Sequence, residues 1–90
     1  MEIKDFREQI NVLDEQIVEL IGKRMDIAVG IGLEKKRQGL PVFDSTRENE
    51  RLDAVRALTD KPEYKEHMAN IYRAIMDETK LIEQQLIDEV

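Results

Sequence analysis

Residues 4–38 read KDFREQINVLDEQIVELIGKRMDIAVGIGLEKKRQ, and this stretch decides the fold. Its apolar residues recur at alternating spacings of three and four, which is the pattern of a helix that packs along another helix. A helix of this length spans on the order of 50 Å, whereas a compact chain of this size measures only ~30 Å across. We therefore predict a homodimer in which a second chain covers the seam. The seam residues are Ile3, Phe6, Ile10, Leu13, Ile17, Leu20, Ile27 and Ile31.

Two proline-containing breaks divide the rest of the chain, Gly39-Leu40-Pro41 and Asp60-Lys61-Pro62. Proline stops a helix because it lacks a backbone donor and disfavours helix in the residue before it. The predicted fold is all-α, with helices at about 4–38, 45–59 and 63–88. Gly30 and Gly32 weaken the first helix, but good helix formers follow them, so we expect it to continue. A glycine there also allows a backbone or a ligand to come close.

Composition narrows the class of protein. Ninety residues fit a single domain, residues 1–90, with 41% hydrophobic and 38% charged residues and a net charge of -6. The chain has no cysteine and one histidine, so disulfides, cysteine-bound metals and multi-histidine zinc sites are excluded. The acidic balance argues against nucleic acid as a partner. No apolar run reaches the ~18 residues of a membrane span, and no secretory signal is visible, so we expect a cytoplasmic protein.

One position of the long seam is charged. Continuing the spacing from Leu20 leads to Arg24, and Lys35 lies on nearly the same face three turns later. Ala28 and Ile31 stand between them, so this face predicts a shallow pocket with a cation at each end. The alternative is an arginine that reaches back to the solvent. We favour an anion site, because an unpaired buried charge is very costly.

Polar residues also interrupt the regular pattern of the other two helices. Thr79 lies on the apolar stripe of the third helix, and Glu83 follows one turn later on the same face. Such a threonine can equally well bond back to the preceding turn. Arg47 and Arg51 form a basic pair beside Glu48 on the second helix, which alone is typical of a solvated surface. Asp44 or Ser45 can cap that helix, and Ser45 with Glu48 fits a capping box.

Several short motifs lie along the chain: Arg7 in FREQI, Asp14 in NVLDEQI, Arg24 in IGKRMDIA, Lys35 in GLEKK, Pro41 to Glu48, and Thr79 with Glu83 in DETKLIEQQ. Together these residues resemble the all-helical chorismate mutases (type II, AroQ class) over almost the whole chain. The family's fold is an intertwined three-helix homodimer. Its reaction is the Claisen rearrangement of chorismate to prephenate in phenylalanine and tyrosine synthesis, which requires no metal or cofactor.

The resemblance implies that a shared pocket binds the chorismate dianion. Arg24 and Arg7 of the partner subunit would bind the two carboxylates, and Lys35 would reach a carboxylate and the ether oxygen. Glu83 occupies the position of the second donor to the ether oxygen, where many bacterial members have glutamine. A carboxyl donates only when protonated, so this departure puts the pH optimum in doubt. Gln84 is adjacent, but its side chain is expected to point about 100° away.

The resemblance also implies roles for four further residues. Glu48, with the backbone at Asp44, would hold the ring hydroxyl of the substrate, and Arg47 would shape the charge of the site. Thr79 would donate to a carboxylate.

Two alternatives to the mutase remain, an isochorismate pyruvate lyase of the same fold and a non-catalytic helical dimerisation module. The sequence leaves open whether the chain was cut from a bifunctional protein.

Overall fold

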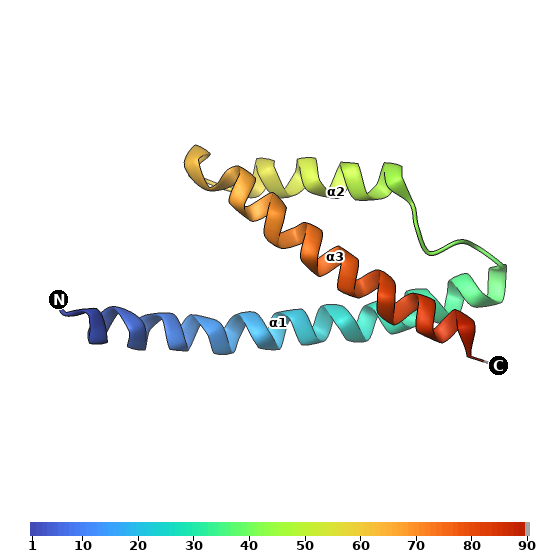
Figure 1. Cartoon of the computed structure of the whole chain (residues 1–90), viewed down its shortest axis with the longest axis horizontal. Helices are drawn as coiled ribbons and strands as arrows, with labels where there is room; N and C mark the ends of the chain where they lie inside the picture. Colours follow the sequence, from blue (N-terminus) through green and yellow to red (C-terminus); the bar gives the residue numbers. More distant parts are fainter. Residues whose placement is uncertain (90) are drawn as a thin grey trace.

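The computed structural model describes residues 1–89 and is built of three helices (Figure 1). The elements are α1 (Ile3–Gln38), α2 (Ser45–Leu58), the 3-10 turn η1 (Pro62–Tyr64) and α3 (Lys65–Asp88). No strand occurs among these residues, which confirms the predicted all-α class. The predicted start of the third helix, at about residue 63, agrees to within a few residues with the observed start. The proline opens a tight 3-10 turn, and the α-helix begins at Lys65.

The ends of the first two helices fix the segment between them. Gly39 ends α1 with a φ of 69°, in the left-handed region that glycine enters without strain. Leu40 then donates its N–H to the Lys35 carbonyl at 2.9 Å, the bond of a Schellman cap. Asp44, rather than Ser45, caps α2, because its carboxylate accepts from the Arg47 N–H at 3.0 Å. The Ser45 capping box was therefore a wrong prediction.

The helix α3 joins the other two. It packs against α1 and against α2, whereas α1 and α2 make no direct packing contact within residues 1–89. Figure 1 shows α2 and α1 on opposite sides of the diagonal α3. The molecule measures 54 × 26 × 14 Å. The predicted long helix therefore does extend beyond the rest of its own chain.

The hydrophobic core is small and lies mainly between α2 and α3. Leu52, Ala69 and Met76 form one buried cluster, with Tyr72 packed against it. The predicted stripe of α2 is only partly buried, since Leu58 stays exposed. None of the described helices combines the length and the apolar character needed to cross a membrane.

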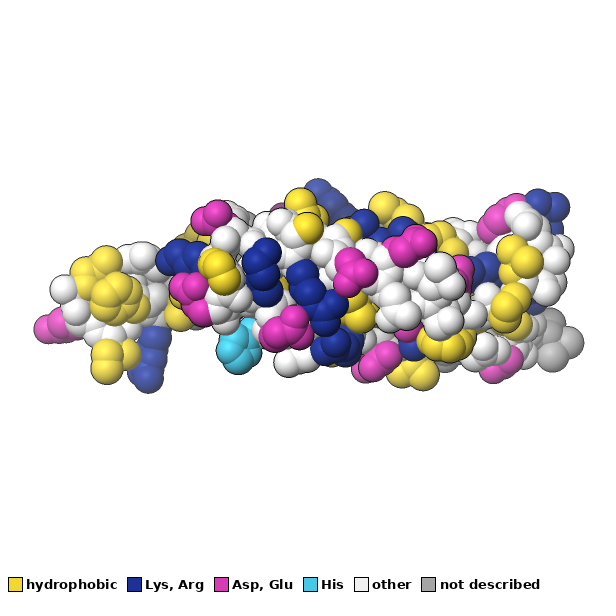
Figure 2. Space-filling model, turned by 90° about the horizontal axis from the view of Figure 1, so that it is seen from above, with side chains coloured by type: hydrophobic (Ala, Val, Ile, Leu, Met, Phe, Trp, Pro, Cys, Tyr) yellow, Lys and Arg dark blue, Asp and Glu magenta, His cyan; other side chains and the backbone are white. Residues whose placement is uncertain are grey.

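The N-terminal half of α1 lies beside no other helix (Figure 1). Its seam residues from Ile3 to Leu20 are all exposed by half or more, between 50% and 68%. Figure 2 shows hydrophobic side chains standing open at that end of the molecule. The isolated chain therefore leaves its most regular apolar stripe uncovered.

The crossing of α1 and α3 is closest at Gly32, which is buried. A Cβ at this position would lie 3.1 Å from the Cα of Glu83 and 3.0 Å from Cδ1 of Leu86. The expectation that a glycine here allows another backbone to approach is confirmed. The approach brings α3 against the last two turns of α1, and these carry Lys35.

Candidate active site

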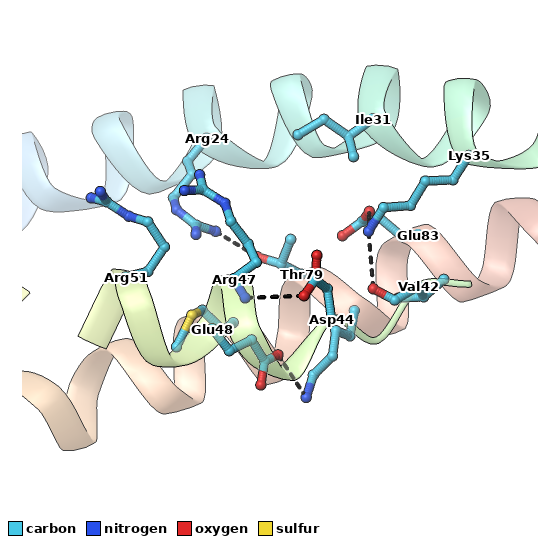
Figure 3. Close-up of a pocket in the computed structure, with 12 residues that line it drawn as sticks. Arg24, Ile31, Lys35, Val42, Asp44, Arg47, Glu48, Arg51, Thr79 and Glu83 are labelled. Atoms are coloured by element: carbon cyan, nitrogen blue, oxygen red, sulfur yellow. Dashed lines mark hydrogen bonds and ion pairs between the residues drawn. The ribbon is translucent and has the colours of Figure 1, made fainter. Parts of the chain in front are cut away.

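A cavity of about 310 Å³ opens where the three helices and the segment between α1 and α2 meet (Figure 3). Its size lies at the lower end of the range for small-molecule sites, about 300–1,000 Å³. Helix α3, which packs against both α1 and α2, contributes lining residues together with those two helices. The lining residues are Arg24, Ile31, Lys35, Val42, Asp44, Arg47, Glu48, Arg51, Met76, Thr79, Lys80 and Glu83.

The structure brings seven of the eight residues singled out from the sequence into this cavity. They are Arg24, Lys35, Asp44, Arg47, Glu48, Thr79 and Glu83. Arg7 is the exception. It lies near the start of α1 and does not line the cavity of its own chain. Ile31 lines the cavity as expected, but Ala28, the other predicted floor residue, is buried outside it.

Thr79 holds Arg24 in place at one end of the cavity. The Arg24 guanidinium donates through Nη1 to Thr79 Oγ1 at 2.7 Å, joining α1 to α3. The same hydroxyl donates to the Ile75 carbonyl at 2.7 Å, which is the bond back to the preceding turn. Its single proton is therefore used, so in this arrangement Thr79 orients the arginine and does not donate into the cavity.

Lys35 and Glu83 form the opposite end of the cavity. The Lys35 ammonium donates to the Val42 carbonyl at 2.9 Å and lies 3.1 Å from Glu83 Oε1. Glu83 is only 5% exposed, although Gln84 beside it is exposed. The expectation that Glu83 faces inward is thus confirmed.

The pairing of these two groups is incomplete. Although Oε1 of Glu83 lies within ion-pair distance of Lys35, it has no hydrogen-bond partner among the described residues. A buried oxygen without a hydrogen bond is costly. The cost falls if a ligand contacts it.

Glu48 projects from α2 and pairs with Lys80 of α3 at 2.9 Å. The hydrogen bond that Lys80 donates to Glu48 raises the pKa of the Lys80 ammonium, burial opposes this rise, and a further bond donated to Asp77 adds to it. Lys80 therefore carries its charge at neutral pH. The Asp44 carboxylate is already engaged as the cap of α2. Only its backbone and its remaining lone pairs can serve a ligand.

The cavity is cationic in an acidic chain. Five Lys or Arg residues and three carboxylates line it, which gives a net charge of +2 against -6 for the whole chain. Figure 2 shows several Lys and Arg side chains over the middle of the upper face of the molecule, with Asp and Glu side chains among them. A small dianion matches this balance. No cluster of three or more metal-binding side chains occurs among residues 1–89.

Sequence reasoning missed several lining residues. Arg51 was interpreted as part of a solvated charge run, and its i,i+4 spacing from Arg47 was the signal that both face one way. Met76 both packs in the buried cluster and lines the cavity. Val42 lies in the matched stretch Pro41 to Glu48 but was given no role, because it acts through its backbone carbonyl. Lys80 was missed because its long side chain reaches Glu48 on another helix.

Comparisons of the sequence with known proteins point to one family. The family model described as chorismate mutase type II matches residues 6–84. The chorismate mutase of Methanocaldococcus jannaschii is 25% identical over 88 residues, which cover 97% of this chain and 89% of that protein. The bifunctional chorismate mutase/prephenate dehydratase of Aquifex aeolicus is 30% identical over 90 residues, covering 94% of this chain. The T-protein of Haemophilus influenzae is 34% identical over 59 residues, or 66% of this chain.

The relatives differ in length. The chain spans 25% of the Aquifex aeolicus protein and 16% of the Haemophilus influenzae protein, but most of the Methanocaldococcus jannaschii protein. No solved structure gives a significant match to the chain.

Proposed function

The chain belongs to the type II chorismate mutase family, and from this premise we propose that it rearranges chorismate to prephenate. The observation that carries the proposal is the cavity with a net charge of +2, which has Arg24 at one end and Lys35 with Glu83 at the other. Chorismate is a dianion, and fixed guanidinium and ammonium groups suit its carboxylates. The step then belongs to phenylalanine and tyrosine synthesis.

The proposed reaction depends on how the substrate is positioned and on electrostatic stabilisation. A Claisen rearrangement breaks the ether C–O bond and forms a C–C bond within one molecule, so no nucleophile or cofactor takes part. The protein restrains the reactive conformation and stabilises the negative charge that develops on the ether oxygen. Lys35 is already fixed by the Val42 carbonyl, so its charge costs little reorganisation when the substrate binds.

Lys35 and Glu83 are the proposed catalytic pair. Both flank the place where an ether oxygen would lie, and the ammonium can donate to it while contacting a carboxylate. Glu83 serves as a second donor only when it carries a proton. The hydrogen bond missing from its buried oxygen leaves that oxygen available to a bound ligand.

The remaining proposed roles concern binding. Arg24, oriented by Thr79, binds one carboxylate. Glu48, with the backbone at Asp44, accepts the ring hydroxyl. Arg47 adds positive charge at the wall formed by α2.

We further propose that the active protein is a homodimer with a shared site. The uncovered seam of α1 supports a second chain, since exposed apolar stripes of this length mark interfaces. In an antiparallel pair, Arg7 of the partner subunit approaches Arg24 and binds the other carboxylate. We also propose that residues 1–90 act as one domain in the cytoplasm.

One assay separates the mutase from its alternatives. Purified protein is incubated with chorismate, the loss of chorismate absorbance is followed, and the products are identified by chromatography; a parallel sample receives isochorismate. Prephenate from chorismate supports the proposal. Salicylate and pyruvate from isochorismate alone would identify a lyase, and no product from either would identify a dimerisation module.

A further inference from the structure

Lys80 contacts three separate parts of the fold at the wall of the cavity. Its ammonium lies 2.9 Å from Glu48 Oε1 on α2 and 3.3 Å from Asp77 Oδ1 on α3. It also lies 4.8 Å from the centre of the Phe43 ring, in the segment between α1 and α2. One side chain therefore connects α3 to both elements that carry the other side of the site.

These contacts differ in how much water surrounds them. The side chains of Lys80 and Glu48 are 28% and 24% exposed, whereas Asp77 is 69% exposed. Ion pairs in water contribute little, because solvent screens them and holding two long side chains costs entropy. Glu48 is therefore the partner that matters, and the contact with Asp77 is a surface contact.

Two charged neighbours on α2 also act on the Glu48 carboxylate. Arg51 lies three residues later on the same helix, a spacing at which a carboxylate and a guanidinium can pair. Asp44 lies four residues earlier, and like charges at that spacing repel. Without another cation, the Glu48 carboxylate is free to turn along its own helix. The Lys80 ammonium approaches from α3 and attracts the Glu48 carboxylate towards α3.

We propose that Lys80 is a positioning residue that holds the Glu48 carboxylate where the substrate hydroxyl binds. A carboxylate has two oxygens and about four lone-pair sites, so one oxygen can be held by the ammonium while the group still accepts a hydroxyl. The inference rests on the proposed function, because it assigns Lys80 a role through Glu48 in the same site. Neither the family resemblance nor the helical pattern pointed to this residue.

The test compares Lys80→Met with Lys80→Arg, each measured alone and in the Glu48→Gln background. Methionine keeps most of the stem and removes the charge, whereas arginine keeps the charge. Asp77→Asn is the matched control, because it removes only the exposed partner of the same ammonium. For each protein, kcat and KM for chorismate are measured, and circular dichroism reports the folded fraction. If Lys80→Met does not fold, Lys80→Gln takes its place.

We expect Lys80→Met to lower kcat/KM by about 10-fold to 100-fold, as for the loss of a hydrogen bond between charged groups. Lys80→Arg should keep most of the parent's kcat/KM. The kcat/KM of Asp77→Asn should stay within about twofold of the parent, because solvent screens the contact that it removes. In the Glu48→Gln background, Lys80→Met should cause little further loss, since its partner is already changed.

Three results would overturn the inference. A folded Lys80→Met protein with the parent's kcat/KM would show that the contact does nothing for the site. An equal loss in both backgrounds would show that Lys80 acts independently of Glu48. A parent protein that converts no chorismate would instead overturn the proposed function, and this inference with it.

Discussion

Replacing Gly32 by Ala tests whether the close crossing of α1 and α3 builds the site. The added Cβ would lie 3.0 Å from Leu86 Cδ1 and 3.1 Å from Glu83 Cα, whereas carbon atoms pack best at about 3.5–4.0 Å. The Leu86 side chain can rotate away, but the Glu83 Cα is backbone, so α3 must shift. Glu83 then moves with it relative to Lys35.

The size of the effect follows from two opposing terms. Overpacking costs about 1–3 kcal/mol, while Ala in place of a helical Gly gains about 1 kcal/mol. Gly30 provides the matched control, because a Cβ there meets nothing within 4 Å. Gly30→Ala should therefore stabilise the protein by about 1 kcal/mol. Gly32→Ala should be less stable than Gly30→Ala by about 1–3 kcal/mol, and it should lose about tenfold or more in kcat.

The assays are urea unfolding at one protein concentration and turnover of chorismate. A fixed concentration matters because the stability of an obligate dimer depends on it. If Gly32→Ala equals Gly30→Ala in both unfolding midpoint and kcat, the crossing at Gly32 does not position Glu83, and this reasoning is refuted.

Three further predictions concern individual side chains. If Glu83 faces the ether oxygen, Glu83→Gln, whose amide can donate at any pH, should have a kcat at neutral pH at least equal to that of the parent; a large loss of kcat would contradict this. Inactive Arg7→Ala and inactive Arg24→Ala proteins, refolded together, should regain activity, because one site of the heterodimer keeps both arginines; heterodimers without activity would exclude a shared site. Thr79→Val should raise KM by about tenfold through loss of the hydrogen bond that orients Arg24, with little change in the urea midpoint; an unchanged KM would show that Arg24 needs no such support.

Periodicity predicted the parts of this molecule that depend on helical faces. The seam of α1 predicted its length, and the interruption at Arg24 predicted a cation in the pocket. The one-turn spacing between Thr79 and Glu83 predicted that Glu83, rather than Gln84, points inward, and the burial of Glu83 confirms this. A helix fixes the direction of each residue within a narrow range, so spacing alone is enough for such statements.

Features that depend on side-chain reach or on local competition were not predictable in this way. Lys80 points 100° from Thr79 on an ideal helix, yet its long stem brings the ammonium to Glu48. The choice of Asp44 over Ser45 as the cap depends on one residue of register in a short segment, where both are good caps. The partner of the Thr79 hydroxyl could not be predicted either, because it depends on where the guanidinium at the tip of the Arg24 side chain lies.

The measurement that tests the central claim most directly is the kcat/KM for chorismate of the parent and of Lys35→Met, with prephenate identified as the product. Lys35 contributes a preorganised donor to the cavity, and removing one such donor typically costs on the order of 100-fold to 1,000-fold. The account predicts prephenate from the parent and a loss of that size in a Lys35→Met protein that remains folded by circular dichroism. A parent that forms no prephenate, or a Lys35→Met protein as active as the parent, would contradict it.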